Sequence, residues 1–303
     1  MLKMNKYEKL TIWVLISIVG FMYIVLPQRH FITSPHMLVK LNPSALSFDW
    51  DSVRVDQLTP QQIMEYLKWT NSSACRLTNG FGGAVAYFVL DGQKTVCLDP
   101  EVRLLPGECL VYSFGVNDEW SFEDQMENFG CDVFAFDPSM NQSYLARGKK
   151  IRFFGYGLSN MVTTGPNGWQ MKRLSDFYVM LEPFHNSTRV IDYLKIDIEG
   201  DEWKALSEII ESGMMDRVRQ LAIEVHLPVH GTLDEVRRAV GIMRSLEEYG
   251  MVRFDSKINP LSETKSEISN MTTYGAYEIA WYNSKLARSS HYYWMQNRNK
   301  KFK

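Results

Sequence analysis

The stretch Leu194–Trp203, LKIDIEGDEW, decides the fold class of this chain. Apolar residues between positions 190 and 198 predict a buried strand, and the Glu-Gly-Asp turn that follows predicts the start of a helix. Asp197 and Glu199 are two residues apart, so on a strand they point to the same side. Acids at the carboxyl end of a buried strand lie where open α/β sheets bind ligands. The alternative is a strand end whose acids are solvated and cap the next helix.

Short apolar strands and amphipathic helices alternate on both sides of this stretch. The pattern predicts a doubly wound, Rossmann-like, mostly parallel α/β sheet. Two later strands are expected to form an antiparallel pair at the C-terminal edge. Sheet strands are predicted at 110–114, 133–136, 151–156, 193–198 and 221–225, helices at 120–129, 201–212 and 233–249, and the edge strands at 251–254 and 274–282.

A small elaboration precedes the sheet. The sequence TPQQ at 59–62 predicts a helix start, because it combines an N-cap threonine, a first-turn proline and a capping-box glutamine. Segments 85–90 and 95–98 flank Asp-Gly at 91–92, which predicts a β-hairpin on that turn.

The N-terminal region predicts the compartment. Residues 10–26, LTIWVLISIVGFMYIVL, carry no charge and are about as long as the shortest bilayer-spanning helices. Three lysines lie within residues 1–9, and Arg29 is the one close basic residue after the apolar run, so the positive-inside rule places the body in the lumen. We expect a signal anchor and a single-pass type II membrane protein of the endoplasmic reticulum or Golgi. A cleaved signal peptide, giving a secreted protein, is the alternative.

The expected organisation follows from these boundaries. Residues 1–9 form a cytosolic tail, 10–26 the anchor, 27–58 a proline-containing stem, 59–285 the lumenal domain and 286–303 a basic and aromatic tail. The net charge of −2 argues against a protein that coats nucleic acid.

Two features agree with a lumenal body. N-glycosylation sequons begin at four asparagines, Asn71, Asn141, Asn186 and Asn270, which predicts a glycoprotein. All four cysteines also follow the apolar run, where disulfides can form.

The cysteine positions suggest how they pair. Cys109 lies six residues before Gly115, and Cys131 lies six before Asp137, so both open their strands at the same register. Neighbouring strands are about 4.8 Å apart, within disulfide reach. We predict Cys109–Cys131, and Cys75–Cys97 tying the hairpin to the preceding helix. Buried free thiols are the alternative.

The ends of the first two sheet strands carry a second candidate site. Gly115 follows the first strand and lets the backbone approach a ligand. The helix that follows favours a bound carboxylate or phosphate at its start. Asp137 ends the next strand, 22 residues later, where nucleoside-binding folds place an acid that accepts ribose hydroxyls. An Asp-Pro turn is the alternative for Asp137.

Four segments together carry a family resemblance: CLVYSFGVNDEWSFE, GCDVFAFDPS, LKIDIEGDEW and LAIEVHLP. They resemble class I S-adenosylmethionine-dependent methyltransferases of the FkbM type, and most closely the methyltransferase-like protein 24 group. The resemblance implies S-adenosylmethionine as the cofactor. It places Gly115, Asn117 and Asp137 against the cofactor, Gly157 near its adenine, and Asp197 near its methionine moiety or the acceptor.

Two positions depart from the family pattern. Ser113 stands at the place of an acid before the glycine loop, and Glu119 stands where FkbM-type proteins have a second glycine.

Glu224 and His226 form a second pair of residues two apart, at the end of the fifth strand. With Asp197 and Glu199 on a neighbouring strand they predict a cluster of acids and an imidazole, in which His226 or Asp197 acts as general base. A divalent metal is a weaker alternative, since a single histidine is a modest ligand set. In a further alternative, Glu199 and Glu224 are hydrogen-bonded structural acids.

The function predicted from these features is a lumenal O-methyltransferase acting on a glycan or another secretory-pathway acceptor. Its partners would be the cofactor, the acceptor and the membrane, with no nucleic acid. Two alternatives stay open. A Golgi glycosyltransferase would use Asp197 and Glu199, or Asp99 and Glu101, as its metal-binding acids, and a catalytically silent binding protein would explain Ser113 and Glu119.

Overall fold

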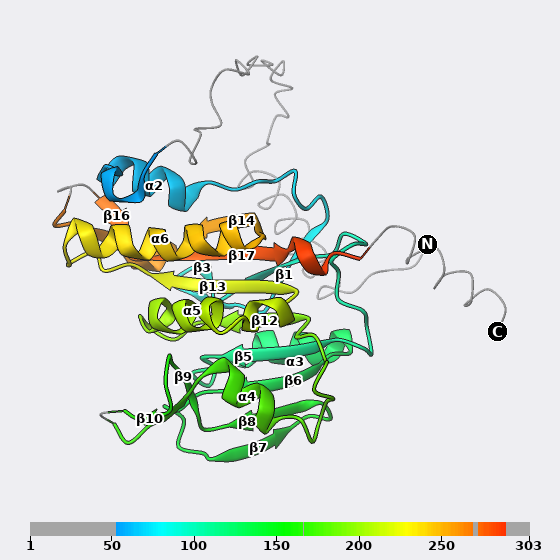
Figure 1. Cartoon of the computed structure of the whole chain (residues 1–303). Helices are drawn as coiled ribbons and strands as arrows, with labels where there is room; N and C mark the ends of the chain where they lie inside the picture. The colour runs from blue at the N-terminus through cyan, green and yellow to red at the C-terminus, as the bar shows by residue number, and fades with distance from the viewer. Residues whose placement is uncertain (1–52, 166, 269–271, 289–303) are drawn as a thin grey trace, which may run out of the picture. The chain divides into compact units, whose positions relative to one another are not determined.

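Eight strands form the central sheet of the protein in a computed structural model that describes residues 53–165, 167–268 and 272–288. Their order is β14-β17-β13-β12-β5-β6-β8-β7 (Figure 1). The predicted cytosolic tail, anchor, most of the stem and most of the C-terminal tail lie outside the described residues. Within the described ranges, no helix has both the length and the apolar character needed to cross a bilayer.

Five adjacent strands are parallel, and three are antiparallel to their neighbours. The predicted doubly wound sheet and its antiparallel C-terminal edge are therefore confirmed. Two details differ from expectation: β17 lies between β13 and β14, and β7, which we did not predict, forms the opposite edge. The parallel strands are β5 (Leu110–Phe114), β6 (Asp132–Phe136), β8 (Ile151–Phe154), β12 (Tyr193–Ile196) and β13 (Gln220–His226), and the antiparallel ones are β7 (Tyr144–Arg147), β14 (Met251–Ile258) and β17 (Ala276–Asn283).

Side chains of alternate residues on the strands build two cores, one on each face of the sheet. On β5, Tyr112 and Phe114 face the core that α4, α5 and α6 cover, whereas Val111 faces the core that α3 covers (Figure 1). The helices are α3 (Ser121–Phe129), α4 (Leu174–Met180), α5 (Glu202–Glu211) and α6 (Leu233–Tyr249).

Helix α2 (Pro60–Lys68) begins as predicted, since the Thr59 side chain accepts from the backbone N–H of Gln62 in a capping box. The residues just before it also pack on the domain. Leu58, which follows the short 3-10 helix η2 (Val55–Gln57), is only 1% exposed.

A β-hairpin does precede the sheet, as predicted, but its turn is not at Asp91-Gly92. Residues 85–90 are not one strand, because the chain reverses at Tyr87 and Phe88, which have φ values of 49° and 68°. Left-handed backbone is uncommon for bulky residues, so the apolar pattern concealed this turn. Gly92 instead connects β3 (Val89–Asp91), which pairs with β2 (Ala84–Ala86), to β4 (Lys94–Cys97), which pairs with β1 (Thr78–Phe81).

Smaller elements complete the described domain. A three-stranded sheet of order β10-β11-β9 stands beside the carboxyl ends of the parallel strands, and β15 pairs with β16 near the C-terminus. Their bounds are β9 (Gly157–Leu158), β10 (Thr163–Thr164), β11 (Gln170–Lys172), β15 (Glu263–Lys265) and β16 (Thr272–Tyr274), and the remaining 3-10 helices are η3 (Met214–Arg217), η4 (Pro260–Ser262) and η5 (Ser284–Leu286).

Both predicted disulfides are confirmed. Cys109 and Cys131 precede β5 and β6 at matching register, with Cα atoms 4.5 Å apart. Cys75 joins Cys97 at the end of β4, with Cα atoms 5.9 Å apart. Each bridge closes a loop of sequence separation 22, for which the chain-entropy model gives about 3 kcal/mol of stabilisation.

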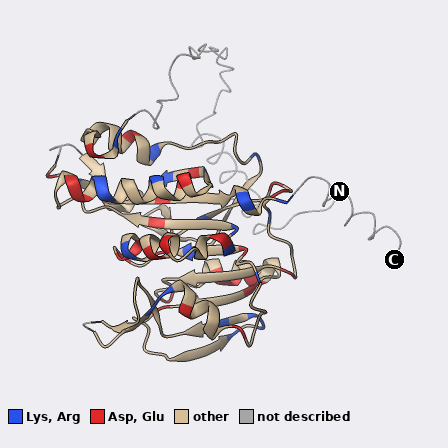
Figure 2. Ribbon diagram, viewed as in Figure 1, with Lys and Arg blue, Asp and Glu red and all other residues tan. Residues whose placement is uncertain are grey.

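Charged residues of both signs are interspersed along α5 and α6 (Figure 2). At the strand ends around Asp197, by contrast, acidic residues outnumber basic ones.

Candidate functional site

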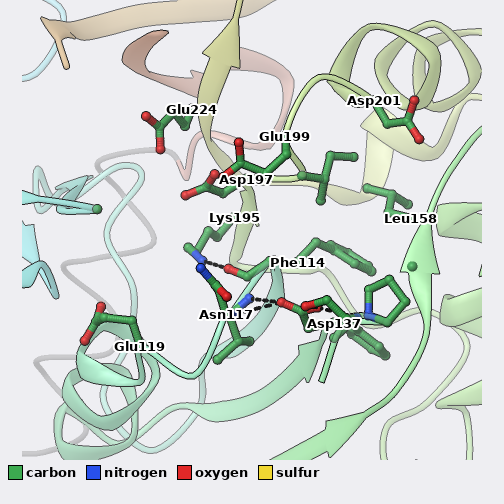
Figure 3. Close-up of a pocket in the computed structure, with 18 of the residues that line it drawn as sticks. Phe114, Asn117, Glu119, Asp137, Leu158, Lys195, Asp197, Glu199, Asp201 and Glu224 are labelled. Atoms are coloured by element: carbon green, nitrogen blue, oxygen red, sulfur yellow. Dashed lines mark hydrogen bonds between the residues drawn. The ribbon is translucent and has the colours of Figure 1, made fainter. Parts of the chain in front are cut away.

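A cavity of about 460 Å³ opens at the carboxyl ends of the parallel strands (Figure 3). The neighbouring strands β5 and β12 end there, and the chain leaves them for opposite faces of the sheet. This is the usual ligand position in doubly wound sheets. Most of the predicted site residues line it: Gly115, Asn117, Asp137, Gly157, Asp197 and Glu199. Glu224 lines it too, whereas His226 is not among its lining residues.

Gly115 is required by the contact between β5 and β12. Its φ of +84° is left-handed, and a Cβ at this position would lie 1.6 Å from the backbone oxygen of Asp197. The strands are held together just beneath it, where the Asp197 N–H donates to the Phe114 carbonyl at 3.0 Å. The glycine loop therefore lies against the backbone of Asp197.

Asp137 braces the glycine loop. Its Oδ2 accepts from the backbone N–H groups of Val116 and Asn117 at 2.9 and 2.8 Å. Its Oδ1 accepts from the N–H and hydroxyl of Ser139 at 2.8 and 2.6 Å. The residue is 5% exposed and forms part of the cavity wall. Its binding of ribose hydroxyls stays a prediction, and the bracing of the loop is the observed role.

Gly157 lies on the opposite part of the wall, at the start of β9. A Cβ there would lie 2.5 Å from Met171 Sδ and 3.0 Å from Pro138 Cγ. The glycine thus lets the small sheet close against the strand ends, and its place near the adenine stays a prediction.

The acid missing at Ser113 is supplied by α3. The Ser113 hydroxyl donates to Glu123 Oε1 at 2.5 Å, and Glu123 is fully buried. Burial raises the pKa of Glu123, an effect that the charge of Lys195 opposes. Lys195 in turn donates to the carbonyl of Gly115. Sequence reasoning missed Glu123 because its position on α3 brings it back to β5 only in three dimensions.

Glu119 is exposed and bound to the helix that follows. Its carboxylate accepts from the Ser121 N–H at 2.9 Å and from the Ser121 hydroxyl at 2.8 Å, so it caps the start of α3. Figure 3 shows it at the edge of the site, near this helix.

Three carboxyl groups stand in one row across adjacent strands. The register aligns Ile196 with Ile223 and Glu224 with Glu278, so Asp197, Glu224 and Glu278 are neighbours. Their oxygens lie within 4.8 Å of one another.

The Lys94 ammonium on β4 contacts the whole row. It lies 3.0 Å from Asp197, 2.5 Å from Glu278 and 3.8 Å from Glu224, and its side chain has no exposed surface. Lys94 was not predicted, because it belongs to the small hairpin layer and meets Asp197 across 103 residues of sequence.

This packing shifts the pKa values of the three carboxyl groups in different directions. Burial and the charge of Asp197 raise the pKa of Glu224 to about 7, against the opposing effect of Lys94. Burial opposes ionisation of Asp197 as well, but Lys94 and Lys195 outweigh it and lower its pKa to about 2. Burial also raises the pKa of Glu278. The row thus holds Asp197 ionised, with Glu224 titrating near neutral pH.

The metal alternative was predicted for the cluster of Asp197, Glu199, Glu224 and His226. Of these, Asp197, Glu199 and His226 offer ligand atoms within 4.8 Å of one another, and a metal there stays a prediction. The row offers a second set. Asp197, Glu224 and Glu278 have the spacing of a ligand set for a hard divalent ion. The Lys94 ammonium already supplies the cation that these carboxylates share, so they do not fit an additional divalent ion.

His226 is held between two glutamates. Its Nδ1 lies 3.0 Å from the buried Glu202, and its Nε2 lies 3.4 Å from Glu199, whose side chain is 83% exposed. Burial lowers the pKa of His226, but the hydrogen bond and charge of Glu202, with the charges of Glu224 and Glu199, raise it overall to about 9. A protonated imidazole is a poor general base, so this geometry favours the carboxylates. The catalytic roles predicted for Glu199 and His226 stay predictions.

The chain was compared with known proteins. It is 26% identical to "Probable methyltransferase-like protein 24" of Homo sapiens over 217 residues, 63% of this chain and 56% of that protein. The protein of the same name in Rattus norvegicus is 25% identical over 215 residues, with the same coverage. The chain thus spans about half the length of the curated relatives it matches.

Among solved structures, the chain is similar to the 16S rRNA (adenine(1408)-N(1))-methyltransferase from Catenulisporales acidiphilia. The two are 12% identical with a TM-score of 0.32, and the match covers 61% of this chain and 87% of that one. A family model described as a methyltransferase domain matches residues 68–272. That segment includes the glycine loop, Asp137, Asp197 and Glu224, and it makes up more than half of the chain. The chain therefore belongs to this methyltransferase domain family, as its sequence segments predicted.

Proposed function

We propose that the protein is an S-adenosylmethionine-dependent methyltransferase whose cofactor occupies the cavity beside Gly115. The observation that carries this proposal is the charge of the cavity. Among the described residues that line it, seven are acidic and one, Lys195, is basic. Such a lining favours a positively charged ligand, and the sulfonium of S-adenosylmethionine is positively charged. The acidic residues are Asp91, Glu119, Asp137, Asp197, Glu199, Asp201 and Glu224.

The residues present fit this cofactor. Asp137 and Gly115 fix the loop between β5 and α3, and Gly157 with Leu158 gives an apolar wall opposite Phe114 and Phe136 for a flat ring. When bound, the cofactor supplies an activated methyl group. The protein has to orient it, exclude water and receive the proton that the acceptor loses.

The same charge balance argues against a glycosyltransferase. A sugar nucleotide carries a diphosphate, which the acidic lining repels unless a divalent ion neutralises it. Lys94 already occupies the position that a divalent ion would take beside Asp197, so no divalent ion is expected there to neutralise a diphosphate.

The departures at Ser113 and Glu119 motivated a catalytically silent alternative. Glu123 supplies the buried acid next to Ser113, and Glu119 is bound to the start of α3. Neither departure fills the cavity, and this supports an active enzyme.

The acceptor and the compartment are further proposals. We propose that the enzyme methylates a hydroxyl of a glycan or another secretory-pathway acceptor, anchored by residues 10–26 with its body in the lumen. The apolar run, the sequons and the two disulfides support this location.

Calorimetric titration with S-adenosylmethionine tests the cofactor assignment. Asp137→Ala should reduce affinity at least tenfold, because it releases the loop amides of Val116 and Asn117. Asp124→Ala is the matched control, since Asp124 pairs with Arg147 and does not line the cavity. Equal affinity of the Asp137 variant and the wild type for S-adenosylmethionine would contradict the assignment of this cavity as the cofactor site.

A further inference from the structure

The carboxyl pair formed by Asp197 and Glu224 has an unusual setting. Both residues line the cavity, they are neighbours in the register of β12 and β13, and their side chains are only 17% and 9% exposed. Glu224 Oε1 accepts from the side chain of Asn259 at 2.7 Å, a neutral donor that does not require an ionised partner. The carboxyl oxygens of Asp197 and Glu224 lie within 4.8 Å of one another.

The carboxyl groups of Asp197 and Glu224 are therefore close enough to hold one proton between them. Two like charges this close in a partly dry site disfavour each other, so the pair tends to keep a proton. Lys94 compensates one charge directly at Asp197 and lies farther from Glu224, which identifies Glu224 as the protonated member. The charged and polar groups that face Glu224 from the surrounding elements are Lys94 on β4, Asp197 after β12, His226 on its own strand, Glu278 on β17, and Asn259 after β14, which also binds Asp91.

We propose that Asp197 and Glu224 share one proton in the free protein, and that Glu224 releases it when the cationic methyl donor binds, which makes Glu224 the base for methyl transfer. This inference rests on the proposed function. It differs from the roles predicted from the sequence, in which Asp197 or His226 was the base.

The proposed role balances charge at every stage. The free pair carries one negative charge, and loss of the shared proton adds a second negative charge that offsets the incoming positive one. During transfer, the acceptor hydroxyl loses its proton to Glu224 as its oxygen bonds to the methyl carbon, and the electron pair of the broken carbon–sulfur bond goes to sulfur. Sulfur becomes neutral as Glu224 becomes protonated, so the site returns to its resting charge.

The magnitude of proton release can be estimated from charge alone. A unit positive charge about 6 Å away, at an effective dielectric constant near 20, shifts the ionisation of a carboxyl group by about two pH units. For a group half-protonated near pH 7, this releases roughly 0.7 of a proton per bound cofactor at pH 6.5.

Calorimetry in buffers of different ionisation enthalpy measures this proton count without any acceptor. The full chain is titrated at pH 6.5 with S-adenosylmethionine and, separately, with S-adenosylhomocysteine, which has the same amino-acid and nucleoside parts but a neutral sulfur. We expect S-adenosylmethionine to release roughly 0.7 more of a proton than S-adenosylhomocysteine. Equal counts for the two ligands in the wild type would overturn the proposal.

Two variants assign the proton to a residue. Glu224→Gln keeps the hydrogen-bonding shape and should abolish the difference between the ligands while both still bind. Glu119→Gln, the same change at another acid of the cavity, should retain the difference. A difference that persists in Glu224→Gln would overturn the assignment to Glu224. If neither ligand binds the folded wild type, the proposed function itself fails, an outcome distinct from binding with equal proton counts.

Discussion

Replacing Lys94 with methionine should destabilise the protein more than any other single lysine change in the described domain. Methionine has the same unbranched length, so the variant removes the charge while it keeps most of the packing. Three carboxyl groups, Asp197, Glu224 and Glu278, then lose the cation that lies 2.5 to 3.8 Å from them. Removal of one partner from a buried charge pair costs about 3–5 kcal/mol, and we expect this loss at pH 7.5.

The loss should depend on pH in a defined direction. Without Lys94 the pKa values of Glu224 and Glu278 rise further and that of Asp197 rises from its lowered value, so the folded variant holds more protons than the folded wild type near neutral pH. An acid whose pKa is raised by folding destabilises the protein as pH increases, at about 1.4 kcal/mol per pH unit for each proton. Between pH 7.5 and pH 5.5 the penalty should therefore shrink by up to about 3 kcal/mol.

Urea unfolding at the two pH values, with disulfides intact, measures both effects. Lys257→Met is the matched control, because Lys257 is 48% exposed and pairs with Asp255 at 3.0 Å. It should cost at most about 1 kcal/mol at either pH. The reasoning is refuted if Lys94→Met costs less than about 1 kcal/mol at pH 7.5, or if its cost is the same at both pH values.

Two further predictions concern the glycine loop and His226. Gly115→Ala should lower stability by about 3 kcal/mol or more and abolish cofactor binding, because its Cβ would collide with the Asp197 backbone. Gly168 is the control: it also has a positive φ, +78°, but no described atom lies within 4 Å of its Cβ position, so Gly168→Ala should cost only about 1 kcal/mol. Thermal melting compares the two, and equal costs would contradict the collision. His226 has a pKa of about 9, raised above its ordinary value, so its contribution is present below pH 6.5 and is lost as the pH rises towards 9. Wild-type stability should fall by up to about 3 kcal/mol over that window, Glu202→Gln should flatten the fall, and a fall of the same size in that variant would show that Glu202 is not the cause.

The sheet could be predicted because its signals are local. The strand of LKIDIEGDEW, the glycine after β5 and the acid after β6 each follow from neighbouring residues, and the matching positions of the cysteines just before β5 and β6 led to the correct disulfide. The turn at Tyr87 and Phe88 was missed because its residues are typical of strands rather than of turns.

The chemistry of the site was harder to predict because it depends on contacts distant in sequence. Lys94 contacts Asp197 from the small hairpin layer. Glu123 supplies the acid that is missing at Ser113, ten residues earlier in the chain. The place of Glu224 beside Asp197 could be predicted from the ends of two neighbouring strands, but nothing in the local sequence around Glu224 indicates its protonation. The parallel register of β12 and β13 brings them together.

A structure of the protein with S-adenosylhomocysteine tests the central claim most directly. We expect the ligand in the cavity between the Gly115 loop and Gly157, with its sulfur on the side of Asp197 and Glu224. A ligand bound elsewhere, or a cavity that stays empty at saturating ligand while the protein is folded, would contradict it.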